Sequence, residues 1–220
     1  MNRPSLIRQL MKPLQSRKIY LIRHAQTAAN KAGQADGRSQ SFLTSEGKTQ
    51  ALALRAYLLR AHPDVYDPTR TAIVTSGAHR TEETADIVFP SLPRSTDPGF
   101  LEVDLGDAQG KTWLQTEAEH LIATGHSAED YFPGGESFFS AQQRSKAALD
   151  QLLNGDMRDP VIIGHGGVIS LLILALMDVG ISAFPFTHID NASVSIVELN
   201  LIDNLMYPII STINLAPWKQ

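Results

Sequence analysis

Arginine and histidine, two residue types that can bind or transfer an anionic group, stand side by side as Arg23 and His24. They follow the apolar run 19–22, which is typical of a short buried strand. In an open α/β sheet, ligands bind just beyond the carboxyl ends of the strands. There the guanidinium could hold an oxyanion, and the imidazole could attack an electrophile or move a proton. A structural role is the alternative, in which both side chains cap the strand within a satisfied hydrogen-bond network.

Two further apolar runs lead to the same residue types. The run 71–75 predicts a second buried strand, and Arg80 follows at a helix start, where a cation is unfavourable unless an anion is also present. The run 160–163 predicts a third, followed by His165 between glycines that allow close backbone approach to an anion. Together the three strand ends could supply the positive charge that phosphoryl transfer needs, without a metal.

The spacing of apolar residues predicts helices between and after these strands. They are expected at residues 44–60, in a segment that ends at Val88, and at 113–124, 137–153 and 168–177. Two further strands, at about 192–200 and 207–215, are expected around a turn at Asp203 and Asn204. The alternation predicts an α/β fold: a single-domain three-layer sandwich with a mostly parallel central sheet, helices on both faces and a C-terminal hairpin.

Composition restricts the classes of function. The chain has 220 residues, 43% of them hydrophobic, a net charge of −4 and no cysteine. Disulfides and thiolate catalysis are therefore excluded, and we expect neither nucleic acid nor a membrane as a partner. The sequence has no dense cluster of metal ligands and no Walker-type glycine loop, so we expect no metal and no cofactor. A chain without cysteine suits a reducing compartment, and we predict a cytoplasmic protein.

Residues 1–17 contain no acid and several basic residues. An organellar transit peptide has that composition, but prolines at positions 4 and 13 leave little room for an amphipathic helix, which favours a solvated basic extension. We place the domain at residues 18–220. Within it, residues 104–136 are expected to form an irregular cap over the site.

The stretch from Lys18 onward resembles the signature of the histidine phosphatase superfamily, also called the phosphoglycerate-mutase-like family. That signature is an apolar strand followed by R-H-G-[EQ]-[ST] and, shortly after, an asparagine. The matching residues here are Arg23, His24, Gln26, Thr27 and Asn30. Ala25 stands where glycine is commonest.

Further segments resemble the family in the same order, over residues 18 to about 200. They are L-T-x-x-G-x-x-Q-A at 43–51, S-x-x-x-R at 76–80, the glutamate of L-x-E at 102, P-G-G-E-S at 133–137 and H-G-G at 165–167. Gly164 replaces a usual Ser or Thr, so one hydroxyl partner is missing. The P-G-G-E-S turn resembles the phosphatase branch.

The resemblance implies a metal-independent phosphomonoester hydrolase that acts on a small phosphorylated metabolite through a phosphohistidine at His24. In that interpretation Glu102 first gives a proton to the leaving group and then activates water. Charge is stabilised by Arg23, Arg80 and His165, and Thr27 and Asn30 are lesser candidates for phosphate contacts.

Several alternatives stay open from the sequence. Asp104 or Asp107 could replace Glu102 as the acid, because all three are close together in the chain. The protein could be a cofactor-dependent phosphoglycerate mutase or a phosphate-binding module without turnover. The sequence does not identify the physiological substrate, and it leaves the oligomeric state open, a homodimer included.

Overall fold

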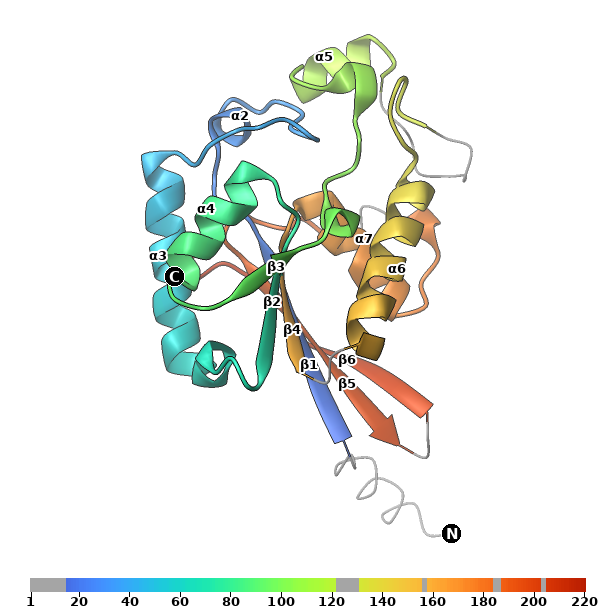
Figure 1. Ribbon diagram of the computed structural model, residues 1–220. Coiled ribbons are helices and arrows are strands. Elements are labelled where there is room, and N and C mark those ends of the chain that lie inside the picture. Colours follow the sequence, from blue (N-terminus) through green and yellow to red (C-terminus); the bar gives the residue numbers. More distant parts are fainter. Residues whose placement is uncertain (1–14, 122–130, 156–157, 184–186, 203–204) are drawn as a thin grey trace.

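The computed structural model describes residues 15–121, 131–155, 158–183, 187–202 and 205–220. Its centre is a six-stranded sheet with the order β3-β2-β4-β1-β5-β6 (Figure 1). The strands are β1 (Gln15–Arg23), β2 (Thr71–Thr75), β3 (Arg94–Thr96), β4 (Asp159–Gly164), β5 (Val194–Ile202) and β6 (Leu205–Leu215). β1, β2, β3 and β4 run parallel, whereas β5 is antiparallel to β1 and to β6. The mostly parallel sheet with a C-terminal hairpin is therefore confirmed.

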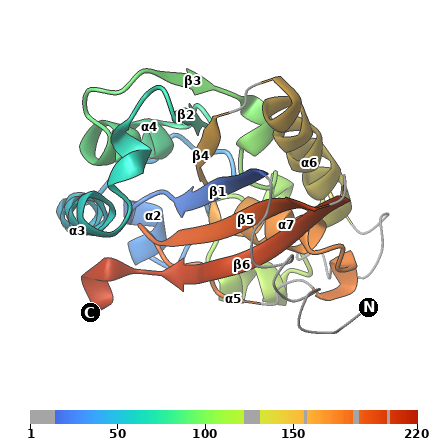
Figure 2. The same ribbon diagram turned by 90° about the horizontal axis from the view of Figure 1, so that it is seen from below.

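Helices cover both faces of the sheet. They are α2 (Ala28–Lys31), α3 (Ser45–Ala61), α4 (His79–Val88), α5 (Trp113–Ala118), α6 (Phe138–Gly155) and α7 (Gly166–Leu176). Helices α3 and α4 lie on one face and α6 and α7 on the other (Figures 1 and 2). Short 3₁₀ helices span Pro63–Tyr66, Pro98–Phe100, Gly106–Ala108, Ile181–Ala183 and Pro217–Lys219. No helix in the described ranges is both long and apolar enough to cross a membrane.

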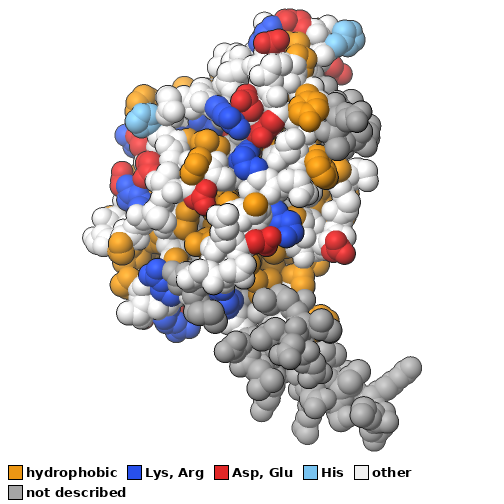
Figure 3. All heavy atoms as spheres, turned by 45° about the vertical axis from the view of Figure 1, so that its right-hand side comes forward, with side chains coloured by type: hydrophobic (Ala, Val, Ile, Leu, Met, Phe, Trp, Pro, Cys, Tyr) orange, Lys and Arg blue, Asp and Glu red, His pale blue; other side chains and the backbone are white. Residues whose placement is uncertain are grey.

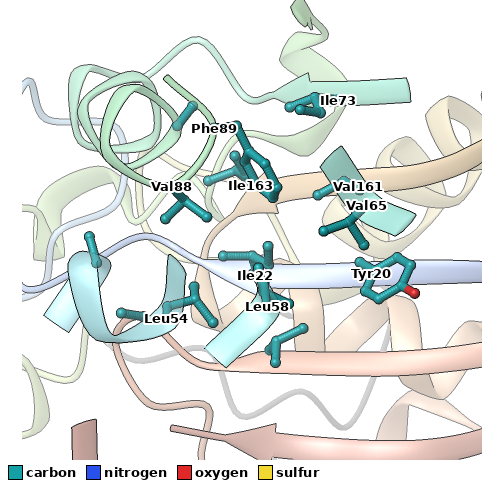
Figure 4. Packing of buried hydrophobic residues seen from close by; sticks show 14 of the residues in the cluster. Tyr20, Ile22, Leu54, Leu58, Val65, Ile73, Val88, Phe89, Val161 and Ile163 are labelled. Atoms are coloured by element: carbon teal, nitrogen blue, oxygen red, sulfur yellow. The ribbon is translucent and has the colours of Figure 1, made fainter. Parts of the chain in front are cut away.

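Strand β1 shows why the sheet needs cover on both sides. Its side chains alternate, so Tyr20 and Ile22 pack against α3 and α4, whereas Ile19 and Leu21 pack against α6 and α7. Figure 4 shows the first of these clusters, where Leu54 and other residues of α3 meet the strand. A continuous apolar run is typical of a strand buried on both faces, and here it predicts the strand correctly.

The helix boundaries follow local signals. Thr44 caps α3 as predicted, because its hydroxyl accepts a hydrogen bond from the Gly47 amide at 2.9 Å. Helix α5 is shorter than predicted: it ends at Ala118, residues 119–121 are not helical, and residues 122–124 lie outside the described part of the chain. Strand β1 begins at Gln15, three residues before the expected domain start at 18. Strand β3 was not predicted.

The described part of residues 104–136 lies above the carboxyl ends of β1, β2 and β4 (Figure 1). A separate apolar cluster holds it there; its members are Ala35, Val103, Leu105, Ala108, Phe132, Ala141 and Leu171. The glycines of this segment permit close backbone crossing, because a Cβ on Gly135 would lie 2.2 Å from the Asp104 carbonyl oxygen. The segment thus packs directly over the strand ends that carry the predicted site residues.

Candidate active site

His24 follows the last residue of β1 and is nearly completely buried. Its Nδ1 lies 2.8 Å from the carbonyl oxygen of Ala25, which can only accept a hydrogen bond. Nδ1 therefore carries the hydrogen, and Nε2 keeps its lone pair. Burial, and then the cations Arg80 and Arg23, hold the pKa of His24 well below its usual value. The result is a neutral imidazole with an unprotonated Nε2.

Ala25, which stands where the family usually has glycine, causes no backbone strain. The described residues with positive φ do not include it. Its amide donates to the Thr84 hydroxyl at 3.0 Å, which fixes the loop after β1 against α4. An alanine is therefore compatible with this turn.

Arg80 lies in the first turn of α4 and is completely buried. Its Nε donates to His24 Nε2 at 3.3 Å, and its Nη atoms donate to the carbonyl oxygens of Ser39 at 2.7 Å and Gly37 at 2.6 Å. The carboxylate of Asp36 is 3.9 Å away. The structure thus brings Arg80 to His24 but directs most of its donors to the loop after α2 rather than into the cavity.

Arg23 lines the cavity together with His24. One Nη atom donates to the Ile189 carbonyl oxygen, and its buried Nε has no hydrogen-bond partner. A Cβ on Gly166 would lie 3.3 Å from that Nε, so the glycine after His165 leaves room for the guanidinium. Burial lowers the pKa of Arg23, and the carboxylates of Glu102 and Asp190 oppose that shift.

His165 precedes α7, and its ring meets the His24 ring edge-on with centroids 5.2 Å apart. The Ser76 hydroxyl lies 2.8 Å from His165 Nε2, while Nδ1 is buried without a hydrogen-bond partner. Burial, followed by Arg80, holds the pKa of His165 well below its usual value. Gly164 gives no hydroxyl, and Ser76 on another strand end supplies one instead. Sequence reasoning gave Ser76 no role, although it opens the S-x-x-x-R segment.

Glu102 reaches the N-terminus of α7. Its carboxylate accepts hydrogen bonds from the amides of Gly167 and Val168, each at 3.1 Å. A Cβ on Gly167 would lie 2.7 Å from Glu102 Oε1, so this glycine makes the approach possible. Glu102 lines the same cavity as His24, whereas Asp104 and Asp107 do not; Asp104 instead lies 3.2 Å from an Arg38 nitrogen.

Thr27 and Asn30 together cap the N-terminus of α2, and they are not equivalent as ligand candidates. Each side chain bonds the backbone amide of the other, and Thr27 is completely buried away from the cavity. Asn30 does line the cavity, and its Oδ1 accepts from Asn191 Nδ2 at 3.0 Å. The same Asn191 nitrogen donates to the His24 carbonyl oxygen at 3.0 Å, so it ties the signature loop to the start of β5.

The cavity at these strand ends has a volume of about 460 Å³. Its polar lining residues are Arg23, His24, Asn30, Gln34, Asp36, Glu102, Ser170, Thr187 and His188. The rest of the wall is largely apolar and includes Trp113 and Phe132. In the described part of the chain, no group of three or more His, Asp or Glu side chains is arranged to hold a metal ion.

This combination of fold and strand-end residues is that of one known family. The profile of the histidine phosphatase superfamily (branch 1) matches residues 19–202. The chain therefore belongs to this superfamily.

Relatives include enzymes with different names. A metal-independent phosphoserine phosphatase of Arabidopsis thaliana is 31% identical over 190 residues, which cover 82% of this chain and 76% of that protein. A probable phosphoglycerate mutase of Erwinia tasmaniensis is 28% identical over 188 residues, covering 82% and 84% of the two chains. The solved mycobacterial glucosyl-3-phosphoglycerate phosphatase has a TM-score of 0.77 at 25% identity, over 91% of this chain and 99% of that one. The same mycobacterial enzyme has also been solved with inorganic phosphate.

Proposed function

We propose that the protein is a metal-independent phosphomonoester hydrolase whose nucleophile is His24. The observation that carries this proposal is the fixed tautomer of His24. Its Nδ1–H is held by the Ala25 carbonyl, and its depressed pKa keeps Nε2 unprotonated at neutral pH. A neutral imidazole at the floor of a cavity can attack phosphorus without first losing a proton.

The proposed reaction has two steps. His24 Nε2 attacks phosphorus while the ester bond breaks, and Glu102 protonates the departing alcohol oxygen. Glu102 then takes a proton from a water molecule, which attacks the phosphohistidine and releases inorganic phosphate. In the structure the Glu102 carboxylate accepts hydrogen bonds from two α7 amides. We propose that an incoming phosphoryl group competes for those amides, so that Glu102 can take up a proton from water before it acts as the acid.

Positive charge for the transferring group comes from the protein in this proposal. Arg23 faces the cavity and has an unpaired Nε, and Arg80 contacts the attacking nitrogen. His165 is neutral and would contribute its unpaired Nδ1 as a hydrogen-bonding group rather than as a charge. Such fixed donors stabilise the charge that spreads over the phosphoryl oxygens. The name of the Arabidopsis relative, a metal-independent phosphatase, supports a mechanism without a metal.

A phosphoglycerate mutase is the second candidate, because one relative at 28% identity bears that name. A mutase returns the phosphoryl group to the same carbon skeleton, whereas a phosphatase releases it to water. Phosphorus NMR of 3-phosphoglycerate with the enzyme separates the two, since only a mutase produces 2-phosphoglycerate.

The decisive experiment is release of phosphate from nitrophenyl phosphate, with and without a chelator, combined with an acid quench. We expect chelator-resistant turnover and an adduct on His24 that is acid-labile and base-stable. His24→Ala should remove nearly all activity, since the loss of a nucleophile can cost about a million-fold. A His24→Ala variant with normal turnover would refute the assignment, and absence of turnover in the wild type would favour a silent binding module.

A further inference from the structure

One wall of the cavity is apolar and firmly packed. Val103, Leu105 and Phe132 line it and belong to the buried cluster beneath residues 104–136. Phe138 meets Phe132 edge-on, with ring centroids 5.3 Å apart. Because these side chains are held by each other and by the cluster, the wall offers a preformed apolar surface within the cavity that His24 also lines.

The same wall offers little positive charge. Among the described lining residues, the Arg23 guanidinium is the one permanent cation, and it adjoins the reacting end of the cavity, whereas Asp36 and Glu102 are acids. Residues 104–136 contain seven acidic residues and one lysine, Lys111, which pairs with Glu119. In the upper half of the face drawn in Figure 3, acidic and basic side chains are interspersed rather than gathered into a basic patch.

The arginines closest to this segment already have partners. Arg38 lies within 3.3 Å of the carboxylates of Asp104 and Glu136. Arg144 lies 2.7 Å from Glu136 and donates to backbone carbonyls. A second anionic group on a substrate would therefore be desolvated against an apolar wall, and the described lining residues include no lysine and no arginine besides Arg23 to pair with it.

We propose that this site selects phosphomonoesters whose alcohol part is uncharged and apolar or aromatic, and that it discriminates against alcohol parts that carry a carboxylate or a second phosphate. The inference rests on the proposed function for the identity of the reacting group. It adds the chemical class of the leaving alcohol. The phosphoryl group is placed at His24 and Arg23, and the alcohol part against Phe132 and its neighbours.

Two phosphonates test the selection without relying on turnover. 2-Phenylethylphosphonate and 2-carboxyethylphosphonate share one P–C–C frame, differ in the terminal group, and cannot be hydrolysed. Calorimetry with the full chain should show at least about tenfold tighter binding of the phenyl compound, the lower end of what one buried apolar group contributes in a hydrophobic pocket. Equal binding, or tighter binding of the carboxylate, would overturn the inference.

Trp113 and Leu114 provide a matched pair of variants on α5. Trp113 lines the cavity and is 50% exposed, whereas Leu114 is 77% exposed and does not line it. We expect Trp113→Ala to weaken binding of the phenyl compound about tenfold, and Leu114→Ala to leave it unchanged. Equal effects of both substitutions would overturn the assignment of this wall to the alcohol part.

Charge can also be added at the exposed position Gln34, which lines the cavity. Gln34→Arg should tighten binding of the carboxylate compound more than that of the phenyl compound. An unchanged ratio of the two dissociation constants would count against the charge argument.

The failure of this inference and the failure of the proposed function can be told apart. Tighter binding of the phenyl compound without hydrolysis of nitrophenyl phosphate would refute the proposed hydrolase function but not the pocket assignment. Hydrolysis together with tighter binding of the carboxylate compound would refute the pocket assignment but not the hydrolase function.

Discussion

Replacing Arg80 with lysine keeps the charge of this side chain and removes its shape. The completely buried guanidinium donates to the carbonyl oxygens of Ser39, Gly37 and Asp36 as well as to His24 Nε2. An ammonium has three donors on one atom, so it cannot serve these four acceptors in their observed directions. The substitution therefore tests whether the fork of donors, rather than the charge alone, organises the site.

The expected magnitudes follow from this count. At least one buried carbonyl loses its donor, and an unsatisfied buried acceptor costs about 1–3 kcal/mol, so we expect Arg80→Lys to lower the free energy of unfolding by that amount. His24 also loses the donor to its Nε2. If Arg80 stabilises the transferring phosphoryl group, kcat/KM should fall by roughly 10²–10³, as on removal of an oxyanion-hole donor.

Urea unfolding followed by tryptophan fluorescence, together with kcat/KM for an alkyl phosphate, measures both effects. Arg94→Lys is the matched control, because Arg94 also contacts α4, through Glu82 and Asp86, but lies partly exposed. Arg94→Lys should change the free energy of unfolding by no more than about 1 kcal/mol and leave kcat/KM unaffected. Wild-type stability and wild-type kcat/KM in Arg80→Lys would refute the reasoning, since the side chain would then act as a point charge.

Three further predictions concern the histidines and the acid. Folding holds the pKa of His24 and His165 well below 6.5, so these rings are buried in the neutral form. The free energy of unfolding should therefore be undiminished above pH 6.5 and should fall as the pH drops below 6.5, by up to about 1.4 kcal/mol per pH unit for each histidine. Equal urea midpoints at pH 7.5 and pH 5.5 would contradict the burial of neutral rings. Ser76→Ala removes the hydroxyl on His165 Nε2 and should cost about 1–3 kcal/mol of stability; an unchanged nitrogen NMR spectrum of that ring would argue against the contact. Glu102→Gln should slow alkyl phosphate hydrolysis by about 10²–10⁴-fold and the nitrophenyl phosphate burst much less; if Asp104→Asn shows this pattern instead, the acid is misassigned.

The main strands were predictable because a strand that is buried on both faces has a continuous apolar or β-branched sequence. The runs 19–22, 71–75 and 160–163 are continuous apolar or β-branched segments, and each breaks into polar residues where the sheet ends. Strand β3 has no such apolar run. It has three residues, all exposed, and it is fixed by pairing with β2 rather than by an apolar face.

Within the site, sequence reasoning found residues that belong to motifs and missed partners that the fold brings in from far away. The Ser76 hydroxyl meets a histidine 89 positions later in the chain. Asp36 stands in a loop without periodicity, yet its segment surrounds Arg80. Thr27 matches the motif but serves as a helix cap, because a threonine before a helix satisfies orphan amides whether or not a ligand is near.

The electrostatics of the strand ends connect binding to reactivity in the proposed reaction. Arg80 is buried and Arg23 half-buried, and desolvation lowers the pKa of each. An entering phosphoryl dianion would supply negative charge. The same two cations help to hold the pKa of His24 down and so keep its Nε2 unprotonated. A protein of net charge −4 would thus attract its substrate through local charge, and the groups that attract the phosphoryl group would also keep the nucleophile ready to attack it.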